Sequence, residues 1–174
     1  MALSEPVNAR LHVFANADAE CLAQLAATIW RAHYTSMISA AQIDYMLAER
    51  YTPQKLGLYL NANDRWLKLL RVTDELVGYC SYALTGMNSE MKIEQLYLLQ
   101  EFQGKGLGKL MLRHIEEQSR ILGLHTLTLQ VNKLNLAAIA FYHKAGFVVR
   151  EEAIFDIGNG FTMDDYVMHK ALSL

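Results

Sequence analysis

A glycine-rich turn that leads into a helix is the part of this chain best suited to bind a ligand. The turn, Gln103-Gly104-Lys105-Gly106-Leu107-Gly108-Lys109, separates an apolar run typical of a buried strand, Ile93 to Leu99, from a segment with helical periodicity, Leu107 to Leu122. Each glycine costs about 0.5 to 1 kcal/mol of backbone entropy relative to alanine, so three at alternate positions suggest a role beyond connection. The unpaired N–H groups and dipole of a helix N-terminus bind anions, and Lys105 and Lys109 add positive charge. We therefore predict a phosphate site here.

The spacing of this turn does not match the two common nucleotide-binding patterns. A Walker A loop needs a glycine where the chain has Gln103, and Ser or Thr where it has Leu110. The dinucleotide fingerprint needs glycines at relative positions 1, 3 and 6, whereas here Lys109 is sixth. Neither a nucleoside triphosphate nor a dinucleotide is therefore the expected ligand.

A different pattern, Gln/Arg-x-x-Gly-x-Gly/Ala, is matched by Gln103, Gly106 and Gly108. It is followed downstream by Asn135 and by Phe141-Tyr142-His143-Lys144-Ala145-Gly146-Phe147. In this combination, from about Met91 to Phe147, the chain resembles the GCN5-related N-acetyltransferases. The first helix and the hairpin near the C-terminus loosely resemble those of the bacterial polyamine acetyltransferases.

The resemblance implies that acetyl-CoA binds where two central strands splay apart. Backbone groups of Leu98 and Leu99 would then bind the acetyl and pantetheine portion, beside Gln103. The pyrophosphate would be surrounded by Gly104, Lys105, Gly106, Leu107, Gly108 and Lys109. Asn135 would contact the pantetheine arm, cap the following helix, or do both. Lys144 would approach the cofactor or remain a solvated helix lysine.

Three residues, one of them Leu98, are candidates for the acetyl transfer itself. The backbone N–H near Leu98 would stabilise the negative charge that develops on the thioester oxygen. Tyr142, protonated at neutral pH, would act as the general acid for the departing thiolate, although it could simply pack at the end of a strand pair. Glu94 would accept the proton of the incoming ammonium, or would pair with Lys92 or another cation. Because no nucleophile motif is present, direct transfer is expected.

Composition indicates a single soluble domain spanning residues 1–174. The chain is 52% hydrophobic and 20% charged, with a net charge of −2 and a pI near 6.3, so nucleic acid is not an expected partner. Cys21 and Cys80 have the spacing of neither a disulfide framework nor a metal site. The N-terminus lacks the features of a signal peptide and no apolar run reaches about 18 residues, so we expect a cytoplasmic protein without membrane contact.

Periodicity and turn residues predict a mixed, mostly antiparallel sheet of about seven strands, with helices on both faces and splayed central strands, as the resemblance also implies. The strands are expected at 11–14, 66–72, 76–84, 93–99, 126–131, 147–157 and 161–171. The helices are expected after Asn16 or Asp18, after Ser39, after Thr52, over 107–122 and over 136–145.

The expected activity is transfer of acetyl from acetyl-CoA to a primary amine, as in a small molecule such as a polyamine. Alternatives are acetylation of a protein N-terminus or lysine, and a CoA-binding module without catalysis. Trp30 and His33 would line a substrate cleft or belong to the core. Three carboxylates, Asp44, Glu49 and Asp64, would attract a cationic substrate or simply be solvated. The final hairpin could pair across subunits in a homodimer.

Overall fold

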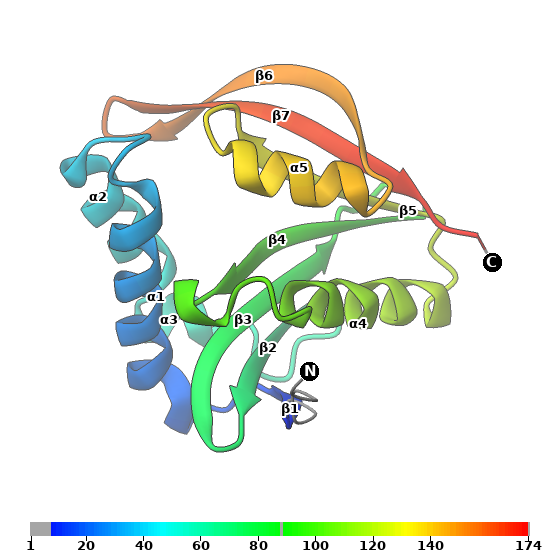
Figure 1. The fold of residues 1–174 in the computed structure, drawn as a ribbon, viewed down its shortest axis with the longest axis horizontal. Helices are drawn as coiled ribbons and strands as arrows, with labels where there is room; N and C mark the ends of the chain where they lie inside the picture. The colour runs from blue at the N-terminus through cyan, green and yellow to red at the C-terminus, as the bar shows by residue number, and fades with distance from the viewer. Residues whose placement is uncertain (1–7, 88, 174) are drawn as a thin grey trace, which may run out of the picture.

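A seven-stranded sheet organises the computed structural model, which describes residues 8–87 and 89–173 (Figure 1). Its strands are β1 (Ala9–Val13), β2 (Arg65–Val72), β3 (Glu75–Leu84), β4 (Glu90–Leu98), β5 (Thr126–Asn132), β6 (Val148–Gly158) and β7 (Phe161–Ala171). The α-helices are α1 (Ala19–Tyr34), α2 (Ala40–Arg50), α3 (Pro53–Gly57), α4 (Leu107–Ile121) and α5 (Leu136–Lys144), and short 3-10 turns span Asn16–Asp18 and Gln100–Phe102.

The strands lie in the order β1-β2-β3-β4-β5-β7-β6. Neighbouring strands are antiparallel except β4 and β5, which are parallel because α4 connects them. This confirms the predicted mixed, mostly antiparallel sheet of seven strands.

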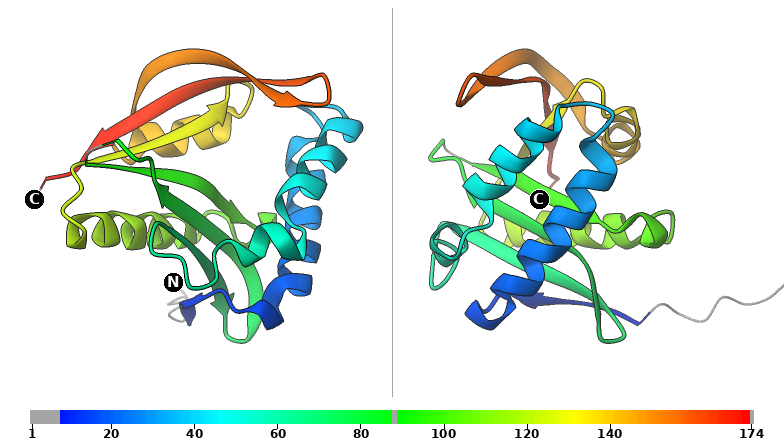
Figure 2. Two further views of the ribbon diagram at one scale, coloured as in Figure 1. Left: turned by 180° about the vertical axis from the view of Figure 1, so that it is seen from behind. Right: turned by 90° about the vertical axis from the view of Figure 1, so that its left-hand side faces the viewer.

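Helices cover both faces of the sheet, so two hydrophobic clusters form (Figure 2). On one face, α4 packs Leu107, Met111 and Ile115 against strands β2 to β5. On the other face, α1, α2 and α3 pack against β2 and β3, with α1 burying the apolar stripe that its sequence predicts. The expected helix starts are also confirmed, because the Ser39 and Thr52 side chains accept hydrogen bonds from the amides of Gln42 and Lys55.

Some element boundaries differ from expectation by a few residues. Strand β4 begins at Glu90, three residues before the apolar run, because Met91 and Lys92 pair with β3 on one side and β5 on the other. Strand β1 covers Ala9–Val13, since its register is set by pairing with β2. Within the described ranges, no helix combines the length and apolar character needed to cross a membrane.

Candidate active site

The central strands β4 and β5 separate part of the way along the sheet. They pair only from Glu90 to Ile93 on β4 and from Thr126 to Leu129 on β5. Beyond Ile93 the two strands diverge toward the side where α1 and α2 lie (Figure 1). The predicted splay is therefore confirmed, and it leaves one edge of β4 without a strand partner.

A β-bulge in β4 lies where this divergence begins. Tyr82 of β3 is opposite Ile93 and Ser81 is opposite Gln95, so Glu94 is an extra residue in β4. The extra residue reverses the alternation of β4 side chains between the hydrophobic cluster under α4 and the cluster under α1, α2 and α3. Ile93 packs in the α4 cluster, and after the bulge it is Leu96 that does so, while Tyr97 packs against α1.

The backbone of Leu98 is directed into the open side of β4. The amide of Leu99 donates to Val77 of β3 at 2.9 Å. Because backbone polar groups alternate in direction along a strand, those of Leu98 point away from β3. The side chain of Gln103 donates to the Leu98 carbonyl at 3.4 Å, consistent with this direction. The Leu98 N–H is thus oriented as the predicted oxyanion donor requires.

The glycine turn ends at the N-terminus of α4 in a conformation that favours glycine. Gly106 is the N-cap residue with φ 80°, in the left-handed region, and Gly104 has φ 74°. The first amides of α4 have no partner within the helix, since its first hydrogen bond is donated by Leu110 to the Gly106 carbonyl. A Cβ on Gly108 would lie 3.5 Å from the Phe141 ring, which is an ordinary van der Waals contact, so packing against α5 does not by itself require glycine here.

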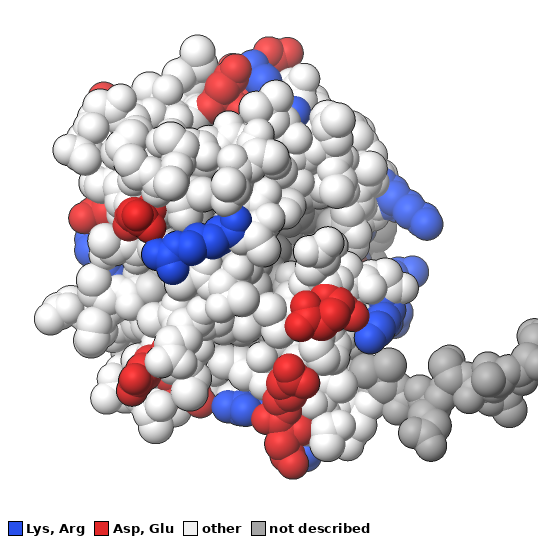
Figure 3. All heavy atoms as spheres, turned by 60° about the vertical axis from the view of Figure 1, so that its left-hand side comes forward, with Lys and Arg blue, Asp and Glu red and all other residues white. Residues whose placement is uncertain are grey.

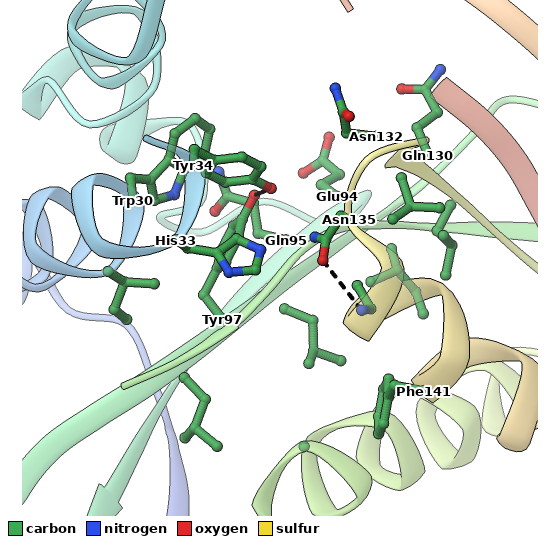
Figure 4. A pocket seen from close by; sticks show the side chains of 18 of the residues that line it. Trp30, His33, Tyr34, Glu94, Gln95, Tyr97, Gln130, Asn132, Asn135 and Phe141 are labelled. Atoms are coloured by element: carbon green, nitrogen blue, oxygen red, sulfur yellow. Dashed lines mark hydrogen bonds between the residues drawn. The ribbon is translucent and has the colours of Figure 1, made fainter. Parts of the chain in front are cut away.

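One cavity of about 1200 Å³ joins this turn to the splay and to the inner side of α1 and α2 (Figure 4). The expected site residues that line it are Glu94, Leu98, Leu99, Gln103, Gly104, Gly106, Gly108, Lys109, Asn135, Tyr142 and Lys144. Two do not. Lys105 places its ammonium 4.9 Å from the centre of the Phe102 ring, and the side chain of Leu107 is buried in the core. Only the backbone of Leu107 is placed to meet a ligand.

Tyr142 lies in the wall of this cavity and is 8% exposed. Its ring packs edge-on against Phe141 and Phe147, with centroids 5.2 and 5.4 Å away. Burial raises the pKa of the phenol well above its ordinary value near 10, with smaller contributions from Tyr97 and Cys80. The hydroxyl is therefore a proton donor throughout the physiological range, as a general acid requires.

Asn135 caps α5 and also faces α1. Its Oδ1 accepts from the Ala138 amide at 3.2 Å, which confirms the predicted cap. His33 lies opposite it (Figure 4). Burial lowers the pKa of His33, and the nearby Asn135 side chain opposes this effect. Contact between Asn135 and the cofactor stays a prediction.

Glu94 has a different partner from the one considered in the sequence. Its Oε2 accepts from the Tyr59 hydroxyl at 2.7 Å. Lys92 instead donates to Gln130 at 3.1 Å, so pairing of Glu94 with Lys92 is wrong. Burial, followed by the Glu94 charge, raises the pKa of Tyr59 well above its ordinary value, so this hydroxyl stays protonated and donates to the carboxylate.

An aromatic cluster that the sequence did not reveal borders the cavity on the α1 side. Trp30 donates to the Tyr79 hydroxyl at 3.2 Å, and the hydroxyls of Tyr51 and Tyr79 lie 2.6 Å apart. The hydroxyls of Tyr34 and Tyr97 lie 3.0 Å apart. Trp30 is 1% exposed yet lines the cavity, so both roles considered for it hold. Trp30, Tyr34 and Tyr97 of this cluster line the cavity, whereas Tyr51 and Tyr79 do not.

The acidic residues that line the cavity are not all the ones that the sequence suggested. Asp44 pairs with Arg31 at 3.0 Å and Asp64 pairs with Arg65 at 3.2 Å, and neither lines the cavity. Glu49 does line it. Asp165 of β7, which sequence reasoning missed, lines it as well and is 6% exposed. The signal was present in the alternation of β7, where Met163, Asp165 and Val167 share the buried face.

The molecular surface on the side of α1 and α2 carries charges of both signs (Figure 3). On the face shown in Figure 3, the basic and acidic side chains are interspersed rather than gathered into one patch. This face therefore offers no large patch of a single sign to attract a charged molecule.

A sheet opened at its parallel strand pair, with a glycine-capped helix at the opening, defines an acetyltransferase-type α/β fold. The model of the acetyltransferase (GNAT) family matches residues 23–147, and the chain belongs to this family. It is an N-acetyltransferase, and its acetyl donor is acetyl-CoA.

Two curated relatives are named for different acceptors, and one solved structure shares the fold. The chain is 26% identical over 138 residues to a spermidine N(1)-acetyltransferase of Thermoplasma acidophilum, covering 77% of this chain and 84% of that protein. It is 32% identical over 114 residues to the ribosomal protein bS18 alanine N-acetyltransferase of Salmonella typhimurium, covering 65% and 75%. The PaiA N-acetyltransferase of Thermoplasma acidophilum, solved with coenzyme A, has a TM-score of 0.79 at 23% identity, covering 94% of this chain and 98% of that one.

Proposed function

We propose that this enzyme acetylates a primary amine of a small molecule, with polyamines as the first class to test. One observation carries the proposal: a single cavity connects the glycine turn, the Tyr142 hydroxyl and the carboxylates of Glu94 and Asp165. A turn suited to phosphate, a hydroxyl able to donate a proton and carboxylates able to attract ammonium therefore border one space. The spermidine acetyltransferase among the relatives supports the choice of acceptor class.

The residues of the turn suit the diphosphate of acetyl-CoA. The unpaired first amides of α4 and the ammonium of Lys109 would hold it, with Lys144 nearby at the cavity wall. Gly104 and Gly106 have room for close approach, since an added Cβ on either would have no neighbour within 4 Å. Asn135 would contact the pantetheine arm, and Leu98 and Leu99 would offer backbone groups at the splay. Bound there, acetyl-CoA supplies an activated thioester.

The protein would then carry the proton transfers of the reaction and stabilise one developing charge. The Glu94 carboxylate would take a proton from the acceptor ammonium, so that the neutral amine can attack. The Leu98 N–H would donate to the oxygen that becomes negative. Tyr142 would give its proton to the departing thiolate and would regain one from the attacking nitrogen, which loses its second proton as the amide forms. Its high pKa keeps the proton available until the sulfur leaves.

Release of CoA thiol across an acceptor panel tests this function. The panel contains spermidine, spermine, simple monoamines, and peptides with either a free N-terminus or a lysine. We expect turnover with the polyamines. Turnover confined to peptides would favour a role like that of the ribosomal protein acetyltransferase, and CoA binding without turnover of any amine would contradict the proposal. The expected cytoplasmic location, single domain and homodimer stay predictions.

A further inference from the structure

Asp165 is a buried carboxylate without a partner in the described structure. It lies in β7 opposite Asn132 of β5 and Ala153 of β6. One of its oxygens, Oδ1, is buried and has no hydrogen-bond partner among the described residues. A buried ionised group costs several kcal/mol when neither a hydrogen bond nor an opposite charge compensates for its lost hydration. An uncompensated carboxylate in a cavity wall is therefore unusual outside functional sites.

The charged groups around Asp165 are engaged elsewhere or separated from it. Lys133 pairs with Asp164 at 2.6 Å and with Glu152 at 2.8 Å, and Lys92 is hydrogen-bonded to Gln130. Arg50 lies over the Trp30 ring, 5.5 Å from its centre. No ion pair connects any of them with Asp165 in the described part of the chain. Burial, followed by repulsion from Asp164, raises the pKa of Asp165 to about 6, so the group is mostly ionised above neutral pH.

Asp165 and Glu94 border the same part of the cavity. Lys92 and Gln130 are bonded across one face of the paired strands, which places Gln130 and Asn132 on that face of β5. The side chain of Asp165 lies on the same face of the sheet, because Asp165 is directly opposite Asn132 in the β5–β7 pair. Figure 4 shows Glu94 and Asn132 on the same side of the cavity. Two carboxylates from different strands thus face one space.

We propose that Asp165 binds a second, non-reacting ammonium group of the acceptor while the reacting amine lies near Glu94. This inference rests on the proposed function and narrows its acceptor to molecules with at least two amino groups. An ammonium on the cavity side of Asp165 would supply the compensating positive charge that the described residues do not provide. Asp165 is then a specificity-determining residue, since a monoamine would leave its carboxylate unpaired.

The test compares Asp165→Asn with Asp164→Asn as a matched control. Both variants remove one carboxylate from adjacent residues of β7, but Asp164 is on the other face and pairs with Lys133. The acceptors are a terminal diamine and the monoamine of equal length. For Asp165→Asn we expect kcat/KM with the diamine to fall about 10- to 100-fold, mainly through KM, because a hydrogen bond to a charged group is lost. The monoamine should be affected less than about threefold, and Asp164→Asn should match wild type.

Calorimetry of the diamine with the CoA-bound enzyme gives a readout that does not need turnover. We expect Asp165→Asn to weaken this binding by the same factor, while its affinity for CoA alone is unchanged. Equal diamine parameters in wild type and Asp165→Asn would overturn the inference and leave the proposed function intact. Equal losses for diamine and monoamine would overturn the assignment to the second amine. A wild type that neither binds nor acetylates any amine would overturn both proposals.

Discussion

At the scale of single residues, the site depends on groups whose protonation is set by burial. Tyr142, Tyr97 and Tyr34 all have pKa values raised by desolvation, so their hydroxyls stay protonated. Of these, Tyr34 and Tyr97 are hydrogen-bonded to each other, whereas no hydrogen bond within the described residues engages the Tyr142 hydroxyl. Of the three hydroxyls, that of Tyr142 is therefore the one free for the proposed role as general acid.

We predict that Tyr142→Phe lowers kcat well over tenfold, with little change in affinity for CoA, because the ring still packs but cannot donate a proton. Steady-state kinetics and calorimetry measure the two effects. Tyr82→Phe is the matched control, since Tyr82 is also buried with a raised pKa, but it bonds to His114 and does not line the cavity. It should lose about 1 kcal/mol of stability and keep its turnover. Unchanged kcat in Tyr142→Phe would remove Tyr142 from the mechanism.

The raised pKa of Asp165 also has a consequence for stability. The pKa of this carboxyl is higher in the folded than in the unfolded protein. Its contribution to stability is therefore complete only at a pH at which the group is protonated in both the folded and the unfolded protein. That contribution is lost as pH rises from about 4 through the folded-state pKa of about 6. Above that range, the ionised carboxylate makes folding less favourable.

We therefore expect Asp165→Asn to be more stable than wild type at pH 8, by about 1 to 2 kcal/mol, and to show no such advantage at pH 4. Denaturant unfolding at the two pH values measures the difference. Asp164→Asn should lack this pattern because its carboxylate is exposed and paired with Lys133. A pH-independent difference for Asp165→Asn would mean that the carboxylate is compensated in solution.

At the scale of elements, two local irregularities make the site. The bulge at Glu94 removes one residue of β4 from the β3 ladder and changes which side chains face each cluster. The left-handed Gly106 begins α4 without a side-chain cap, so its first amides face the cavity mouth. Both features break a regular pattern where a ligand must approach the backbone.

We predict that Gly106→Asp weakens CoA binding through two separable effects. Any side chain at this left-handed position strains the backbone by about 1 kcal/mol, and a carboxylate also repels the diphosphate. Gly106→Ala carries the strain without the charge. Calorimetry should therefore rank affinity as wild type, then Gly106→Ala, then Gly106→Asp. If Gly106→Asp binds CoA as tightly as wild type, the turn is not the phosphate site.

At the scale of the whole molecule, the sheet consists of two groups of strands with a short connection. Strands β1 to β4 and strands β5 to β7 are joined in the sheet only by the paired segments Glu90–Ile93 and Thr126–Leu129. A ligand bound in the splay would contact both groups. The cosubstrate is thus expected to stabilise the fold as well as to supply acetyl.

We predict that CoA at about 100 times its Kd stabilises the protein by about 2.7 kcal/mol and raises Tm accordingly. Hydrogen exchange should slow at Gln95–Leu99 on β4 and in the first turn of α4, where open backbone groups gain partners. The amides of β1, paired with β2 at the far edge of the sheet, provide the internal control. Slower exchange in β1 alone would contradict binding in the splay.

Much of this architecture follows from local sequence. Alternating and helical periodicities identify the strands and helices because a side chain's direction repeats every two residues in a strand and every 3.6 in a helix. Ser39, Thr52 and Asn135 mark helix starts because capping is a contact within three residues. The glycine turn and the family pattern likewise lie within one short stretch, so they are visible without a structure.

Only the tertiary structure could decide which groups meet across the cavity. The Tyr59 and Glu94 side chains are 35 residues apart in sequence, and no local rule pairs them or excludes Lys92. The bulge at Glu94 depends on how β3 and β4 align, which adjacent residues do not specify. Asp165 is one of many acids in the sequence. Its burial and its unpartnered oxygen arise because β5, β6 and β7 place it in the cavity wall, and long-range packing alone determines that.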